Sequence, residues 1–117
     1  MTFPVPHTFT HAPYETVDPG NAGAITIERY GQIVELTSTA AETRTLATPT
    51  RPGMLAIIRV KTYVGAITLT ASGGLNNNGD TVATFLGEGH QLVLISVSEG
   101  AGYRWDVIGN EGGVVVA

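Results

Sequence analysis

Residues 65–71 read Gly-Ala-Ile-Thr-Leu-Thr-Ala, with apolar and polar side chains in alternation. Such alternation is typical of a β-strand with one buried face, because successive side chains point to opposite faces. The run ends at Ser72-Gly73-Gly74, and residues 76–80, Asn-Asn-Asn-Gly-Asp, form the strongest turn signal in the sequence. This stretch therefore predicts a strand followed by a turn.

The same rhythm continues on both sides of this stretch. Short β-type runs between turn clusters cover residues 24–28, 32–37, 54–64, 81–86, 90–97, 103–108 and 114–116. Residues 54–58 are apolar at every position, which favours a central strand. No window keeps the i, i+3, i+4, i+7 apolar spacing of a helix, and the threonines of residues 39–46 favour strand or loop. Residues 24–28 and 32–37 are expected to pair as a hairpin.

The pattern predicts an all-β fold. We expect a single-domain β-sandwich or small β-barrel of about seven to eight mainly antiparallel strands, formed by residues 23–117. A chain of 117 residues has room for one such domain.

Residues 1–22 differ from the rest and are expected to form an extended N-terminal arm. Four prolines interrupt regular hydrogen bonding there, and residues 18–21, Asp-Pro-Gly-Asn, indicate a turn. The segment is either a frayed terminus or an arm that lies across a neighbouring subunit. In the second case its partner contacts would be the apolar residues Phe3, Val5, Phe9 and Tyr14.

Composition excludes several classes of partner. Only 14% of the residues are charged, the net charge is −4, and no window gathers the basic residues that nucleic acid or an anionic membrane surface requires. There is no cysteine, so disulfides and thiolate metal sites are excluded. The N-terminus lacks an export signal, and we expect synthesis in the cytoplasm.

Catalytic and metal motifs are weak throughout. No serine lies in a Gly-x-Ser-x-Gly elbow. His7 and His11 would lie about 13 Å apart in an extended arm, too far to share an ion within one chain, although a ring of histidines around a three-fold axis stays open. Glu28 and Glu35 could face each other across the expected hairpin, and Asp106 could join them, but their spacing is equally that of ordinary outward strand positions. A hydrolase built on these carboxylates is the least favoured interpretation. We predict no enzyme activity, no metal and no cofactor.

Tyr103, Arg104 and Trp105 form the one cluster typical of a recognition patch. Exposed aromatic rings at Tyr103 and Trp105 could stack on sugar rings. Period-two spacing of Tyr103, Trp105 and Val107 instead favours burial of Trp105 in the core.

A longer pattern covers residues 41–110. It includes Thr43-Arg44-Thr45-Leu46, the run 65–70, Asn78-Gly79-Asp80-Thr81, Gly87-Glu88-Gly89 and Tyr103-Arg104-Trp105-Asp106-Val107. This series resembles structural proteins of tailed bacteriophages, namely head-decoration or fibre-type β domains. The resemblance implies a virion surface protein, usually trimeric, that docks on the capsid lattice or is built into a fibre.

We therefore expect a capsid decoration protein of a phage particle. It would bind the major capsid protein or other virion proteins as a homotrimer, at the surface of the virion. The alternative is a carbohydrate-binding or adhesin-type module of a tail fibre or receptor-binding protein, with Tyr103 and Trp105 as the stacking residues.

Overall fold

Burial alternates along the longer strands of the protein. The computed structural model describes residues 15–117, and in β3 (Gln32–Thr37), β5 (Leu55–Thr62) and β8 (Gln91–Glu99) nearly every second residue is buried. The remaining strands are β1 (Glu15–Thr16), β2 (Gly23–Ile25), β4 (Glu42–Leu46), β6 (Ile67–Thr70), β7 (Val82–Phe85), β9 (Gly102–Glu111) and β10 (Val115–Val116). The described residues contain no helix, as the sequence predicts, and residues 39–46 include strand β4.

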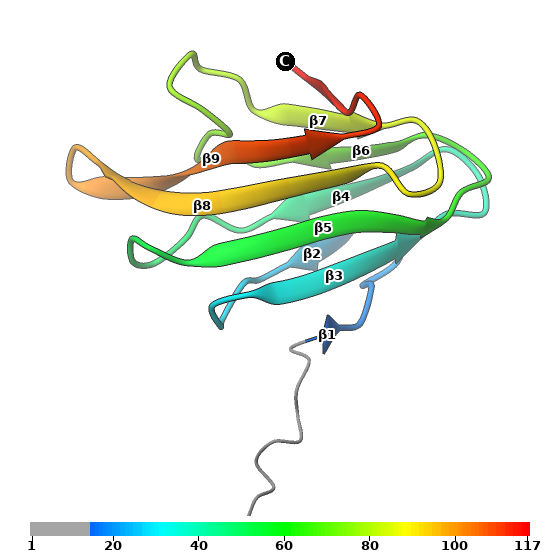
Figure 1. Cartoon of the computed structure of the whole chain (residues 1–117), viewed down its shortest axis with the longest axis horizontal. Helices are drawn as coiled ribbons and strands as arrows, with labels where there is room; N and C mark the ends of the chain where they lie inside the picture. Colours follow the sequence, from blue (N-terminus) through cyan, green and yellow to red (C-terminus); the bar gives the residue numbers. More distant parts are fainter. Residues whose placement is uncertain (1–14) are drawn as a thin grey trace, which may run out of the picture.

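The strands form two five-stranded sheets. Sheet A has the order β1-β3-β5-β8-β9, and sheet B has the order β10-β7-β6-β4-β2. Figure 1 shows sheet A as the front layer and sheet B behind it. The predicted all-β sandwich is confirmed, and β5 is the central strand of sheet A, as its apolar sequence indicates. The strands are not mainly antiparallel as expected, because four of the eight pairings in the described chain are parallel. No helix in residues 15–117 is long and apolar enough to span a lipid bilayer.

The two sheets are mixed, because the chain crosses between them at each step from β1 to β6. Strands two apart in the sequence therefore become neighbours and run parallel: β1 with β3, β3 with β5, β2 with β4, and β4 with β6. The later pairings, β6 with β7, β5 with β8, β8 with β9 and β7 with β10, are antiparallel. Successive strands from β1 to β6 therefore lie in alternate sheets, whereas the consecutive strands β6 and β7, and β8 and β9, pair as hairpins.

The expected hairpin between residues 24–28 and 32–37 is wrong. β2 belongs to sheet B and β3 to sheet A, so the intervening residues cross the sandwich. The buried Gln32 side chain holds this crossing: its Oε1 accepts the N–H groups of Glu28 (2.7 Å) and Arg29 (3.2 Å), and its Nε2 donates to the Thr26 carbonyl (2.9 Å).

A second crossing is fixed by Ser38. Its Oγ donates to the Gly65 carbonyl (2.8 Å) and accepts the N–H groups of Val64 and Gly65 (3.1 Å each). A side chain at Gly65 would overlap the backbone of Ala40 and Ala41. The connection after β5 therefore passes directly against the turn between β3 and β4, and only glycine permits this approach.

The core lies between the sheets and consists of aliphatic side chains around two aromatic rings, Phe85 and Trp105. No side-chain nitrogen or oxygen atom buried within the described chain lacks a hydrogen-bond partner. Every buried polar side-chain atom of the described chain is therefore hydrogen-bonded within the protein. The apolar side chains that are not part of the core lie on the outer surface of the sandwich.

Candidate interaction surface

The outer face of sheet A carries a continuous patch of aliphatic side chains. Alternation turns one set of residues on β3, β5 and β8 away from the core while their neighbours are buried. The registers place Ile33 beside Ile57 and Ile57 beside Val93, with Leu55 beside Ile95 in the adjacent row. We call this patch the sheet-A face and define it by six half-buried residues: Ile33, Leu55, Ile57, Val93, Ile95 and Val97.

Charged side chains lie only at the margins of the sheet-A face. At one end Arg59 binds Glu35 at 3.0 Å. At the other, Arg104 binds Glu99 at 3.0 Å and Asp106 at 2.9 Å. Hydrogen bonding to Asp106 raises the pKa of Arg104 above its ordinary value. All five of these charged groups are in ion pairs, and the centre of the face is aliphatic.

The outer face of sheet B differs from it and serves as an internal comparison. There Thr43 lies beside Thr68, Thr68 beside Thr84, and Thr45 beside Thr70. Threonine hydroxyls on an outward strand surface remain hydrated, so they make this face more polar than the sheet-A face. The outer face of sheet B thus carries threonines together with Val82 and Val115, whereas the sheet-A face carries isoleucine, leucine and valine alone.

A parallel sheet is usually covered on both faces. The half of sheet A formed by β1, β3 and β5 is parallel, yet no other strand of the described chain lies in front of it (Figure 1). The six side chains of the patch are half-buried and adjoin one another, and contiguous apolar surface that solvent still reaches marks protein contacts. The sheet-A face is therefore the candidate interaction surface of this chain.

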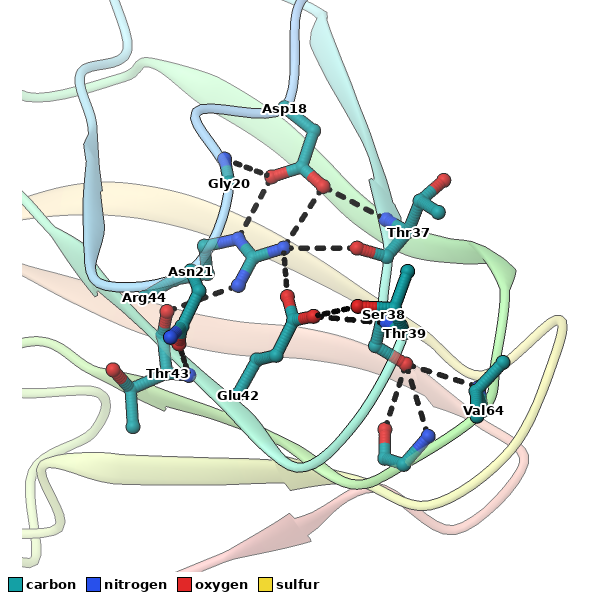
Figure 2. A network of polar contacts seen from close by, with 11 residues as sticks. Asp18, Gly20, Asn21, Thr37, Ser38, Thr39, Glu42, Thr43, Arg44 and Val64 are labelled. Atoms are coloured by element: carbon teal, nitrogen blue, oxygen red, sulfur yellow. Dashed lines mark hydrogen bonds and ion pairs between the residues drawn. The ribbon is translucent and has the colours of Figure 1, made fainter.

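A polar network fixes the edge of the sandwich where the N-terminal segment enters (Figure 2). Its centre is Arg44 of β4, whose side chain is fully buried. Arg44 Nε and Nη2 donate to the two carboxylate oxygens of Asp18 at 2.7 and 2.9 Å. Nη2 also donates to the Thr37 carbonyl and forms an ion pair with Glu42, both at 3.0 Å, while Nη1 donates to the Thr43 carbonyl at 3.0 Å.

Further bonds attach the segment after β1 to the sheets. Asp18 accepts the N–H groups of Thr37 (2.8 Å) and Gly20 (3.0 Å), and Asn21 Oδ1 accepts the Thr43 N–H at 3.0 Å. Residues 15–16 pair with β3 as strand β1. The part of the expected arm from residue 15 to residue 22 is therefore attached to the sandwich.

The network also sets the ionisation of its carboxylates. Burial alone would raise the pKa of Asp18, but hydrogen bonds from Arg44 and from the Thr37 and Gly20 amides outweigh burial and hold that pKa below its ordinary value. A hydrogen bond from the Thr39 N–H lowers the pKa of Glu42, with help from Arg44. Both carboxylates are therefore charged in the folded protein at neutral pH.

We expect the free energy of unfolding to fall as the pH drops below about 4. The lowered pKa of Asp18 means that the unfolded chain binds its proton more tightly, so this stabilisation is present above the unfolded pKa and is lost as the pH falls through the folded pKa. Asp18→Asn should be less stable at pH 7 and should show a shallower acid decline, measured by urea unfolding between pH 3 and 7. Glu88→Gln, at an exposed loop position, is the control. Parallel curves for Asp18→Asn and the wild type would contradict this account.

Several residues named from the sequence lie outside the described residues. They are the arm contacts Phe3, Val5, Phe9 and Tyr14 and the histidines His7 and His11. Their expected roles stay predictions.

Trp105 lies in the core, as its period-two position favours. The residue is 1% exposed, and its Nε1 donates to the Ala47 carbonyl at 3.0 Å. A buried ring cannot stack on a sugar, so the alternative role of Trp105 as a glycan platform does not fit this structure. Tyr103, on the same strand, is half-buried.

The three carboxylates of the hydrolase alternative are not gathered. Glu35 binds Arg59 on β5 and Asp106 binds Arg104 on β9, with β5 and β8 between their strands. Glu28 lines a separate open pocket of about 260 Å³ together with Thr26, Ile27, Thr48, Thr50, Arg51 and Met54. No hairpin brings Glu28 opposite Glu35.

Residues 76–80 form a turn, as predicted. Asn76 Oδ1 accepts the N–H groups of Asn78 (2.8 Å) and Asp80 (3.3 Å), and Asn76 Nδ2 donates to Asp80 at 2.7 Å. Within residues 15–117 no group of three or more His, Asp or Glu side chains is placed to hold a metal ion.

The Arg44 network was not anticipated from the sequence, although a signal for it exists. Arg44 stands between Thr43 and Thr45, and alternation directs it inward if both threonines face outward. A buried arginine demands carboxylate partners, which here include Asp18, 26 residues earlier.

No family model matches the sequence, and the search of curated proteins found no significant match.

Proposed function

We propose that this chain is a structural subunit of a tailed-phage particle, a capsid decoration protein that binds the outer capsid surface as a homotrimer. The observation that carries the proposal is the sheet-A face, six aliphatic side chains on β3, β5 and β8 that no other strand of the described chain covers. Such a surface is suited to burial between subunits. The resemblance of residues 41–110 to phage head-decoration and fibre-type domains supports a phage particle as the assembly to which the chain binds.

The protein would act by stabilising the assembled capsid shell, without catalysing a reaction. A protein that binds the closed shell and not its free subunits stabilises the shell by mass action. Major capsid protein is the proposed partner, and the sandwich would act as a rigid body held together by its core and by the Arg44 network.

Sedimentation of the purified chain with capsid shells of the phage that encodes it tests the proposal. We expect a particle mass of three times 12.2 kDa for the free protein, saturable binding to shells, and release of packaged DNA at a higher temperature when the protein is bound. Added oligosaccharides should not compete. A protein that ignores shells but binds sugars would overturn the proposal in favour of a carbohydrate-binding module.

A further inference from the structure

The sheet-A face has an occupant of matching chemistry within the same sequence. We propose that residues 1–14 of one copy lie on the sheet-A face of a second copy, an inference that rests on the proposed function because it gives the homotrimer its contact.

Charge and hydrophobicity of the two surfaces match. Residues 1–14 contain no Asp, Glu, Lys or Arg, and they carry Phe3, Val5, Phe9 and Tyr14. The centre of the sheet-A face is aliphatic, with its ion pairs at the margins. Contact between them buries apolar surface on both sides and leaves no charge without a partner.

Residues 1–14 are joined to the edge strand of sheet A, from which they can reach the sheet-A face of a neighbouring copy. β1, which directly follows them, is the edge strand of sheet A and pairs with β3 at Glu15 and Ile33, so the described chain begins beside the β3 row of the sheet-A face. Val17, just after β1, is 85% exposed and would extend the contact. Fourteen extended residues reach about 46 Å, and the face from β3 to β8 is only about 10 Å wide.

The direction of β1 favours a second copy over the chain's own face. β1 runs parallel to β3 and is paired near the start of that strand, so the chain enters β1 from the end of sheet A at which β3 begins. To cover its own sheet it would have to reverse just before Glu15.

The base of the segment is held in one orientation. The bonds from Asp18 to Arg44 and Thr37, and from Asn21 to Thr43, attach residues 18–21 to β3 and β4. A segment-to-face contact is heterologous, so each copy donates one segment and accepts another, and a ring of three copies closes the set.

Cross-linking in the cysteine-free chain tests the contact directly. Thr10→Cys leaves the apolar residues of the segment intact, and Gln91→Cys places a thiol on the outer surface of β8, opposite Arg59. A mixture of the two variants treated with a bis-maleimide should give a heterodimer. Thr10→Cys mixed with Thr68→Cys, whose thiol is on the outer face of sheet B, should give none.

Complementation provides the second measurement. A chain lacking residues 1–14 and a full-length Ile57→Lys chain should each be monomeric by analytical ultracentrifugation, and their equimolar mixture should form a 1:1 complex. Ile57→Lys should weaken self-association at least about tenfold. The matched variant Thr68→Lys, at an outward position of a strand in sheet B, should assemble like the wild type.

Three results would overturn the inference: an intrachain cross-link as the main product of a Thr10→Cys, Gln91→Cys double variant, self-association of the chain lacking residues 1–14, or absence of the heterodimer. These measurements use no capsid shells. Cross-linking with no shell binding would reject the proposed decoration function alone, whereas shell binding without the cross-link would reject this contact alone.

Discussion

Trp105→Ala is expected to lower the free energy of unfolding by about 4 kcal/mol. The indole is almost fully buried in β9 of sheet A, and its Nε1 donates to the carbonyl of Ala47, which follows β4 of sheet B. The substitution therefore opens a cavity in the core and also leaves a carbonyl group without its donor. Urea unfolding monitored by circular dichroism would measure the loss.

Two variants separate packing from surface effects. Trp105→Phe should retain most of the packing and lose about 1–2 kcal/mol through the missing hydrogen bond. Tyr103→Ala, at a half-buried position two residues earlier, should lose less than Trp105→Ala. A loss below about 1 kcal/mol for Trp105→Ala would contradict the assignment of this ring to the core.

The all-β sandwich could be predicted because burial on a strand is a local property. The alternation in residues 65–71 becomes β6, with Ile67 and Leu69 buried, and residues 76–80 form the predicted turn. Each of these features depends on a few consecutive side chains and their backbone preferences.

Strand partners could not be predicted in the same way. The alternation of residues 24–28 and 32–37 is equally compatible with a hairpin and with crossing between two sheets, since it records only which side chains face the core. The decision depends on contacts distant in sequence, such as Gly23 beside Arg44 and Ile33 beside Ile57.

The sheet-A face could be predicted in part from the sequence. Residues 54–58 are apolar at consecutive positions, so one set of their side chains must face away from the core of a sandwich. That β3 and β8 extend this set into a patch depends on their pairing with β5, which the pattern of any single strand does not contain.

Arg44→Met should cost about 3 kcal/mol of unfolding free energy, because it leaves Asp18 and Glu42 charged at a site where both are largely withdrawn from water. This figure is at the lower end for a broken buried pair, since the Asp18 side chain stays 15% exposed. Amide exchange at Gly20 and Thr37 should accelerate, because both N–H groups donate to Asp18.

The cause can be isolated with two further variants. Arg59→Met removes an arginine that is 40% exposed from its pair with Glu35, and an exposed pair contributes less than about 1 kcal/mol. Adding Asp18→Asn and Glu42→Gln to Arg44→Met should restore part of the lost stability, since no uncompensated charge then remains. If the triple variant is less stable than Arg44→Met alone, the cost arises from lost arginine packing and hydrogen bonds, and charge compensation is not what holds the N-terminal segment against β4.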